Sequence, residues 1–248
     1  MRSLLRFVVG VVLLVAAGIA LMPAASLDRP LAARTQDRVR LADAKGPWWR
    51  GEGVLVTADG SARLPVAWRL ALVPLLTGTV VIDLQPGSDN SMPSGTITLR
   101  HGTLGVRDLH LRAPAALAAA FVPALKTVAL GGNVDVQSSA FSFHEGVGVG
   151  VFDATWQGAR IVAGQLALDL GIVSVSAVPK GDAQSGIIRN TGGDVAIDGT
   201  IDDQAGVVEV ALLLKPTASA SSAVRAMLPL LGIGDGAGSV RVTWRSNR

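Results

Sequence analysis

Few residues in this chain have side chains that could carry out acid–base, nucleophilic or metal chemistry at neutral pH. Cysteine and tyrosine are absent, and histidine occurs three times, as His101, His110 and His144. These positions form neither H-E-x-x-H nor any other closely spaced metal-binding pattern. His110 and His144 alternate with apolar neighbours, so we expect both on the solvent-facing side of strands. The histidines therefore predict neither a catalytic site nor a metal site.

The remaining short motifs also argue against catalysis and cofactor binding. Glycines alternate with valines over residues 146–150, which is typical of a strand whose glycines face a tightly packed neighbour. Residues 232–237 fit a loose G-x-G-x-x-A pattern, but they lie between a predicted helix and a predicted strand, the reverse of the dinucleotide-binding order. Asp198, Asp202 and Asp203 lack the spacing of a calcium loop, so we expect a solvated hairpin. Neither G-x-S-x-G nor S-x-x-K occurs. We predict no enzyme and no cofactor.

Composition and charge narrow the class of protein further. The chain of 248 residues has 22 lysines and arginines against 19 aspartates and glutamates, a formal net charge of +3. The basic residues are scattered and are not interleaved with aromatic side chains, unlike a nucleic-acid-binding surface. Apolar residues make up 49% of the chain and charged residues only 17%, which provides enough apolar material for a folded core. We therefore predict a folded protein that does not bind nucleic acid.

The tryptophans are the residues best placed for a specific structural or binding role. In two places a tryptophan stands two residues before a glycine, at the expected edge of a strand. A tryptophan buries a large area, whereas a glycine permits close backbone approach or a β-bulge. Two interpretations stay open, a pin that shapes the sheet and an anchor for a docking partner or a lipid interface. The candidate residues are Trp48, Trp49, Gly51, Trp68, Trp156 and Gly158.

The N-terminal segment is long and apolar enough to cross a membrane. Residues 7–27 contain no charged residue and follow Arg2 and Arg6. At about 1.5 Å per residue they reach roughly 31 Å, close to the hydrocarbon thickness of about 30 Å. We therefore assign residues 1–27 to a cytoplasmic stub and a transmembrane helix. The side chains expected to anchor this helix are Phe7, Val8, Leu13, Leu14, Ile19 and Leu21.

Two features of this segment leave other interpretations open. Ala24, Ala25 and Ser26 are small enough for cleavage of a signal peptide, although no clean A-x-A pattern precedes a polar start. Basic residues between positions 29 and 45 oppose export, but long domains translocate largely regardless of such charges. The basic residues at the start of the chain favour an N-terminus that stays in the cytoplasm. We therefore expect a bacterial inner-membrane protein with residues 28–248 in the periplasm.

Beyond the anchor, the period of apolar residues predicts one helix and then many strands. Residues 28–45 have helical spacing and several arginines, which predicts a charged juxtamembrane helix. From residue 46 the period is two, as at Ile97 and Leu99, and clusters of Gly, Asn and Asp separate the runs. Two Ala- and Leu-rich stretches, residues 114–127 and 217–231, are predicted short helices. The fold class is mainly β, with a curved and largely antiparallel sheet.

The two parts of the β region, residues 46–145 and 146–248, share an order of landmarks. A Trp-x-Gly motif, a proline before an apolar helix and a strand after glycines each recur at an offset of about 105 residues. Such a repeat predicts two similar halves stacked end to end, each with a short helix. The corresponding positions are Trp49 and Trp156, Pro114 and Pro216, and Val134 and Val240.

Several short motifs follow one another in a characteristic order. They are Gly46-Pro47-Trp48-Trp49-Arg50-Gly51, Trp68-Arg69-Leu70, Pro74-Leu75-Leu76-Thr77-Gly78, Asn190-Thr191-Gly192-Gly193 with Gly199, and Leu228-Pro229-Leu230-Leu231-Gly232. Over roughly residues 1–245 this order resembles the type II secretion system protein N family. The second Trp-x-Gly motif has Asp153 where the first has Gly46, so the resemblance does not imply equal roles for the two.

The resemblance implies a function and partners. It implies a non-enzymatic inner-membrane component that assists the export of folded proteins from the periplasm across the outer membrane. The implied partners are other type II secretion components, either the inner-membrane platform or the outer-membrane secretin, together with membrane lipid.

A lipid-handling function is the alternative. The AsmA-like bridge family also combines an N-terminal anchor with a curved sheet, and the apolar face of the sheet would then line a groove for acyl chains. A groove lined continuously by Val, Leu and Ile would favour this function. A face sealed by the helices at residues 114–127 and 217–231 would oppose it.

Overall fold

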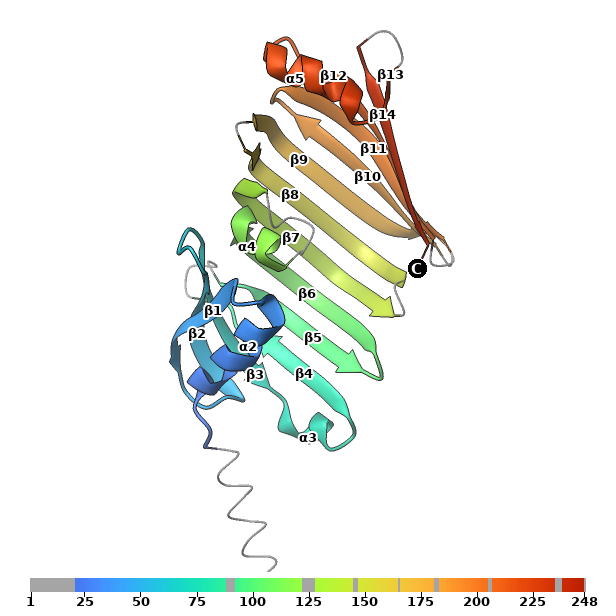
Figure 1. The fold of residues 1–248 in the computed structure, drawn as a ribbon. Helices are drawn as coiled ribbons and strands as arrows, with labels where there is room; N and C mark the ends of the chain where they lie inside the picture. Colours follow the sequence, from blue (N-terminus) through green and yellow to red (C-terminus); the bar gives the residue numbers. More distant parts are fainter. Residues whose placement is uncertain are drawn as a thin grey trace, which may run out of the picture.

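Alternating apolar and polar residues produce one continuous antiparallel sheet (Figure 1). The computed structural model describes residues 21–87, 92–121, 128–144, 147–164, 166–180, 183–204, 207–234 and 238–247. Over these residues fourteen strands form the sheet, ordered β1 to β12, then β14 and β13. Each strand up to β11 pairs with the next strand along the chain. The prediction of a mainly β, antiparallel fold is confirmed.

The strands differ widely in length. The first seven are β1 Val39–Lys45, β2 Arg50–Thr57, β3 Arg63–Leu70, β4 Thr79–Leu84, β5 Ser94–Arg100, β6 Thr103–Pro114 and β7 Ala129–His144. The others are β8 Val147–Ala163, β9 Leu166–Lys180, β10 Ala183–Thr191, β11 Val195–Gln204, β12 Val207–Pro216, β13 Ile233–Gly234 and β14 Val240–Asn247. The helical segments are η1 Ala24–Leu27, α2 Asp28–Thr35, α3 Leu72–Leu75, α4 Ala115–Phe121, α5 Ser222–Met227 and η3 Leu228–Leu230.

The helix predicted for residues 28–45 is wrong in its second part. Helix α2 begins at Asp28, as expected, but it ends at Thr35 and strand β1 follows. Gln36 has a left-handed φ of 55°, and its amide donates to the carbonyl of Ala32, which closes the helix. The buried Thr35 hydroxyl then accepts a hydrogen bond from the Val39 amide at 3.2 Å. Neither glycine nor proline marks this turn, so the sequence gives little sign of it.

Both Ala- and Leu-rich stretches contain a helix, as predicted. Helix α4 occupies the start of the first stretch, and residues 122–127 lie outside the described residues. In the second stretch, the Ser221 side chain caps α5 by accepting a hydrogen bond from the Val224 amide, and η3 continues from the end of α5. In the second stretch, residues 217–221 are not helical, so the helix there is shorter than the composition suggested.

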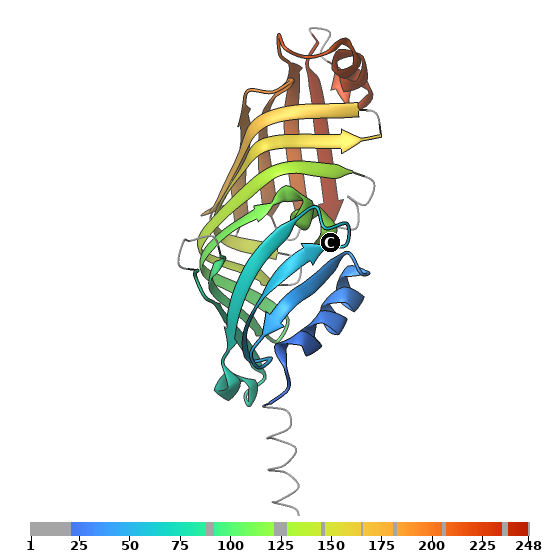
Figure 2. The ribbon, with the colours of Figure 1, turned by 90° about the vertical axis from the view of Figure 1, so that its left-hand side faces the viewer.

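Helices α2, α4 and α5 lie on the concave side of the curved sheet (Figure 2). The first core cluster packs Leu117 of α4 against β-sheet side chains; its buried members are Val39, Ala62, Leu64, Val66, Ala113 and Leu117. The second packs α5 and η3 against the other end of the sheet; its buried members are Ala159, Leu170, Val173, Val195, Ala220, Val224, Leu228 and Val240. The described core is therefore divided between the two ends of the sheet.

Candidate functional site

The concave face of the sheet is lined mainly by apolar side chains, and the buried Gln184 and Asp203 are polar exceptions on it. Residues that pair across antiparallel strands point to the same face, so the register identifies the members of each face. We call this concave surface the apolar face. Its pairs include Ile82 with Ile97, Ile97 with Val106, Val106 with Phe141, Ile201 with Val210, and Val210 with Trp244.

The helices cover the apolar face only in part. Four large side chains on the apolar face remain 36–54% exposed. They lie on strands in the middle and at the far end of the sheet. We call them the open residues: Leu99, Leu104, Phe143 and Trp244. Three of them are direct neighbours, because Leu99 pairs with Leu104 and Leu104 pairs with Phe143. The face is therefore neither sealed nor fully open.

The glycine alternation over residues 146–150 is confirmed at its two described glycines. A Cβ at Gly148 would lie 2.6 Å from Cζ of Phe141. A Cβ at Gly150, where φ is 150°, would lie 2.5 Å from Cα of Phe141. The Phe141 ring also meets that of Phe152, with 6.3 Å between the ring centroids. The glycines thus make room for an aromatic ring on the apolar face.

Gly51 and Trp68 form one packed unit where β2 begins and β3 ends. The two residues pair directly, and a Cβ at Gly51 would lie 2.8 Å from Cζ2 of Trp68 and 3.0 Å from Cβ of Ala24. The Trp68 indole N–H donates to the carbonyl of Trp48 at 2.8 Å. Ala24 is fully buried. These contacts require glycine at position 51 and support the structural interpretation of the motif.

Trp156 makes a comparable contact in β8. Its indole N–H donates to the carbonyl of Gly131 at 2.7 Å, and its ring packs against the second core cluster. Gly158 has a left-handed φ of 59° at the bulge between β7 and β8. Gly132 lies opposite, where a Cβ would overlap the carbonyl oxygen of Gly158. This pair of glycines lets two irregular strands approach closely.

A further tryptophan packs beside the first Trp-x-Gly motif. By spacing, Trp49 corresponds to Trp156, and the indole of Trp68 donates to the main chain next to Gly51 as the indole of Trp156 does at Gly131. The Trp49 carbonyl accepts a hydrogen bond from the Leu70 amide at 2.6 Å. The sequence could not identify this contact of Trp68, because Trp68 comes from the next strand.

The described part of the N-terminal segment is attached to the sheet. The Ala24 amide donates to the carbonyl of Gly46 at 2.8 Å, and the Trp48 amide donates to the carbonyl of Met22 at 2.9 Å. Pro23 forms an isolated β-bridge with Pro47. The chain is therefore held by the folded domain from residue 22 onward.

The predicted anchor falls mainly outside the described residues. Phe7, Val8, Leu13, Leu14 and Ile19 lie there, whereas Leu21 is described and is 80% exposed. Among the described residues, no helix combines the length and the apolar character that a membrane span requires. The transmembrane helix stays a prediction.

Helix α3 presents apolar side chains for which the sequence predicted no binding role, although Leu76 belongs to the motif Pro74-Leu75-Leu76-Thr77-Gly78. It lies between β3 and β4, and Leu72, Val73 and Leu76 at this helix are 42%, 77% and 87% exposed. A signal was available, because residues 70–76 form an apolar run that interrupts the period of two on either side. These side chains are candidates for contact with an apolar partner.

The described histidines and carboxylates make local contacts. His144 forms an exposed hydrogen bond with the Thr103 hydroxyl at 2.9 Å. Across the described residues, no group of three or more histidines and carboxylates could hold a metal ion. The expectation that Asp203 lies in a solvated hairpin is wrong, because this residue is only 7% exposed. Asp203 pairs with Gln184 and Val208, so its side chain shares their face of the sheet.

Two of the described carboxyl groups have lowered pKa values, and both stabilise local structure. The Thr57 hydroxyl and the amide and hydroxyl of Ser61 lower the pKa of Asp59 to about 2 in the turn between β2 and β3. Hydrogen bonding from Arg40 lowers the pKa of Asp28, and the Leu41 amide adds to this while burial opposes it. The Arg40 Nε–Asp28 Oδ1 distance is 3.0 Å. Asp28 thereby ties the start of α2 to β1.

Substitution of Asp28 by asparagine is expected to lower the melting temperature by a few degrees at pH 7. Since folding lowers its pKa, ionised Asp28 contributes stability above the ordinary value of 3.8, and this contribution is lost as the pH falls through the lowered pKa. Melting curves of the wild type and Asp28→Asn should therefore converge below pH 3.8. Asp198→Asn serves as the control, because Asp198 forms only an exposed 3.8 Å pair with Arg189. A gap that persists in acid would contradict this assignment.

The fold is that of a mainly β protein built on a single curved antiparallel sheet with one largely apolar face. A family model described as type II secretion system (T2SS), protein N, matches residues 37–243. The chain belongs to this family, and it is a component of the type II secretion system, which confirms the resemblance seen in its motifs. No curated protein sequence and no solved structure gives a significant match.

Proposed function

We propose that the protein is a single-pass inner-membrane component of the type II secretion system that assists the export of folded proteins from the periplasm across the outer membrane. The observation that carries the proposal is the family match, which extends from the end of α2 into β14. The uncharged and mainly apolar residues 7–22 support the anchor. The family is one of secretion components and is not known for catalysis, which supports a non-enzymatic role.

The contacts of the N-terminal segment shorten the proposed anchor. Ala24 is fully buried against the sheet domain, so residues from Pro23 onward are part of the fold and are not available to the bilayer. Residues 7–22 then form the anchor, with a length of about 24 Å as a helix. An anchor of this length leaves little free chain between the bilayer and the domain.

Carbonate extraction of the full chain tests the anchor. We expect the wild type to remain in the membrane pellet, and we expect Leu13→Arg/Leu14→Arg to be released, since each central arginine costs about 2.5–3.5 kcal/mol in insertion. Leu230→Arg, at an 82% exposed position of the domain, is the matched control and should remain bound. External protease should digest the domain only after the outer membrane is opened. Release of the wild type, or a mature N-terminus near Ala25, would refute the anchor.

The domain acts by binding other secretion components, either the inner-membrane platform or the outer-membrane secretin. The exposed apolar side chains support a binding role. Photo-crosslinking in intact cells, with probes at Trp49, Trp156 and Val210, tests it. Adducts with secretion components are expected at one or more positions, and failure of all three to capture any such component would count against direct binding.

Lipid handling is a second candidate function, and the apolar face with its open residues is the observation that favours it. A probe at Val210 on the apolar face should then capture phospholipid. Leu213 provides a matched control, because it lies on the opposite face, paired with Asp198 and Arg241, and is 41% exposed. Equal lipid capture at both positions would indicate non-specific contact and would remove this candidate.

We also propose that residues 46–145 and 146–248 are two similar halves that arose by duplication. The order of elements supports this, since each half contains five strands, a helix and a further strand, namely β2 to β6, α4 and β7, and β8 to β12, α5 and β14. Helix α3 in the first half, and η3 and β13 in the second, have no counterpart among the described elements of the other half. The core clusters also separate, with members between residues 31 and 120 in one and between 156 and 242 in the other.

A further inference from the structure

Exposed apolar side chains gather at the end of the sheet where the chain enters the fold. Strand β3 ends at Leu70 beside Trp49, so α3 follows directly next to the turn that holds the N-terminal segment. Both ribbon views place α3 and the start of the described chain at this same end (Figures 1 and 2). We call these side chains the entry-end patch: Leu21, Met22, Leu72, Val73 and Leu76, which are 42–87% exposed.

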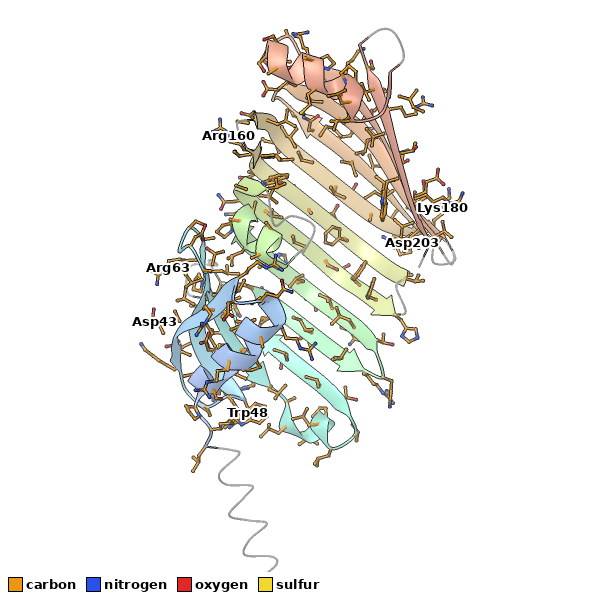
Figure 3. All side chains as sticks on the ribbon, viewed as in Figure 1. Asp43, Trp48, Arg63, Arg160, Lys180 and Asp203 are labelled. Carbon is orange, nitrogen blue, oxygen red and sulfur yellow. The ribbon has the colours of Figure 1, made fainter. Side chains whose placement is uncertain are left out.

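Trp48 extends the patch toward the first strands. Figure 3 shows Trp48 at this end of the molecule, far from Lys180 and Asp203. Trp48 is half-buried, and its amide donates a hydrogen bond to the carbonyl of Met22. Tryptophan is enriched at the boundary between acyl chains and headgroups, because one part of its ring is apolar and the other carries a hydrogen-bond donor.

Positive charge lies beside the patch. An open pocket at the same strand ends is lined by Lys45, Arg50 and Arg69, and the acidic residue among its described lining is Glu52. Arg50 pairs directly with Arg69. Two like charges opposite one another on a sheet repel, and Asp83, which pairs with Arg69 on its other side, offsets this only for Arg69, so an anion bound beside Arg50 would stabilise the pair. Phosphate groups of anionic lipids have the required charge.

The length of the anchor fixes where this end of the sheet must lie. This step rests on the proposed inner-membrane anchor of residues 7–22. A span of about 24 Å is shorter than a hydrocarbon core of about 30 Å, so the first folded residues are drawn into the headgroup region. The entry-end patch then meets the bilayer and not bulk water.

We propose that the entry-end patch is a second membrane contact of this protein. Val73 and Leu76 enter the outer, periplasmic leaflet of the inner membrane, and Arg50 and Arg69 bind the phosphates of anionic lipids beside them. Anchor and patch together hold the sheet at a fixed orientation to the bilayer.

A spin label at position 76 tests this contact in the full chain. The sequence has no cysteine, so Leu76→Cys gives a single labelling site. In vesicles of phosphatidylethanolamine and phosphatidylglycerol, we expect this label to be more accessible to oxygen than to a water-soluble nickel chelate. Leu230→Cys is the matched control, since Leu230 is 82% exposed in a short helix at the opposite end, and its label should show the reverse preference.

The role of anionic lipid is tested with the same label. Omitting phosphatidylglycerol should raise the access of the nickel chelate to position 76, and Arg50→Ser/Arg69→Ser should abolish this effect of phosphatidylglycerol.

Three outcomes would overturn the proposal, and they are distinguishable. A water-like label at position 76 in a chain that resists carbonate extraction would refute the patch and leave the anchor intact. Release of the chain by carbonate would refute the anchor and this contact with it. Low access to both reagents, with spin–spin broadening, would show that a second copy of the chain covers the patch.

Discussion

Replacement of Leu228 by alanine is expected to lower the free energy of unfolding by about 3 kcal/mol. Leu228 is 2% exposed and begins η3. It belongs to the second core cluster, together with Val195, Val224 and Val240. The strands below it are hydrogen-bonded on both sides within one sheet, so they cannot collapse readily into the space that the side chain leaves. The cost should therefore include a cavity as well as lost burial.

Leu230→Ala is the matched control for this substitution. Leu230 lies two residues further along the same short helix, but it is 82% exposed. Its truncation should change the free energy of unfolding by no more than about 0.5 kcal/mol. Urea unfolding of the full chain in detergent, followed by circular dichroism, measures both. Equal shifts for the two variants would contradict the packing of η3 on the sheet.

Replacement of Trp68 by alanine is expected to cost about 3 kcal/mol, at the lower end of the range for tryptophan because the residue is half-buried. The substitution removes the ring that packs beside Gly51 and the N–H that donates to the Trp48 carbonyl. Since Ala24 packs at the same place, the segment around Met22 should loosen as well. Limited proteolysis near residue 23, together with urea unfolding, measures both effects.

Trp68→Phe separates packing from hydrogen bonding. Phenylalanine keeps an aromatic ring on Gly51 but lacks the indole N–H, so the Trp48 carbonyl loses its donor, at a cost of about 1 kcal/mol. We therefore expect Trp68→Phe to be less harmful than Trp68→Ala by about 2 kcal/mol. The same destabilisation in both variants would mean that the hydrogen bond, and not the packing, dominates this site.

Much of the sheet could be predicted because one physical rule acts along the whole chain. A strand that is buried on one face must alternate apolar and polar residues, and Ile97, Leu99, Phe141 and Phe143 follow this rule without exception. The glycines at positions 148 and 150 could be interpreted in the same way, since they interrupt the large residues of one face where Phe141 needs space. Such patterns depend on local spacing, which a sequence displays directly.

Other features depend on residues that meet only in the folded chain. The end of α2 is set by the left-handed conformation of Gln36 and by the contact between Thr35 and Val39, neither of which has a distinctive residue type. The role of Trp68 depends on its pairing with Gly51, a consequence of register. Asp203 looked like a member of a solvated acidic cluster, yet its register directs it to a buried position. Spacing along the chain cannot determine such contacts.

The candidate surfaces were only partly predictable for the same reason. The Trp-x-Gly motifs identified two sites of close packing, but the sequence did not assign Trp68 to the first of them. The apolar run at residues 70–76 could have indicated α3. Its proximity to Met22 and Trp48 is visible only in the folded chain, where the end of β3 lies beside the N-terminal segment. The order of the motifs indicated the secretion family, and the family match over residues 37–243 confirms it.

The pairing of nearly every strand with its neighbour in sequence has a consequence for how the fold is made. When a chain emerges N-terminus first, β1 and β2 can pair before β8 has been delivered, and each later strand finds its template already in place. The loops to be closed are short, so the entropic barrier to each addition is low, unlike that of a sandwich whose first and last strands must meet. During this growth the newest strand is always the edge that the next one joins, and the last strand in sequence, β14, is joined by the two-residue strand β13. Strand β13 covers β14 only at Val240 and Arg241, so within the described sheet the rest of β14 is an edge on which a further strand could still pair.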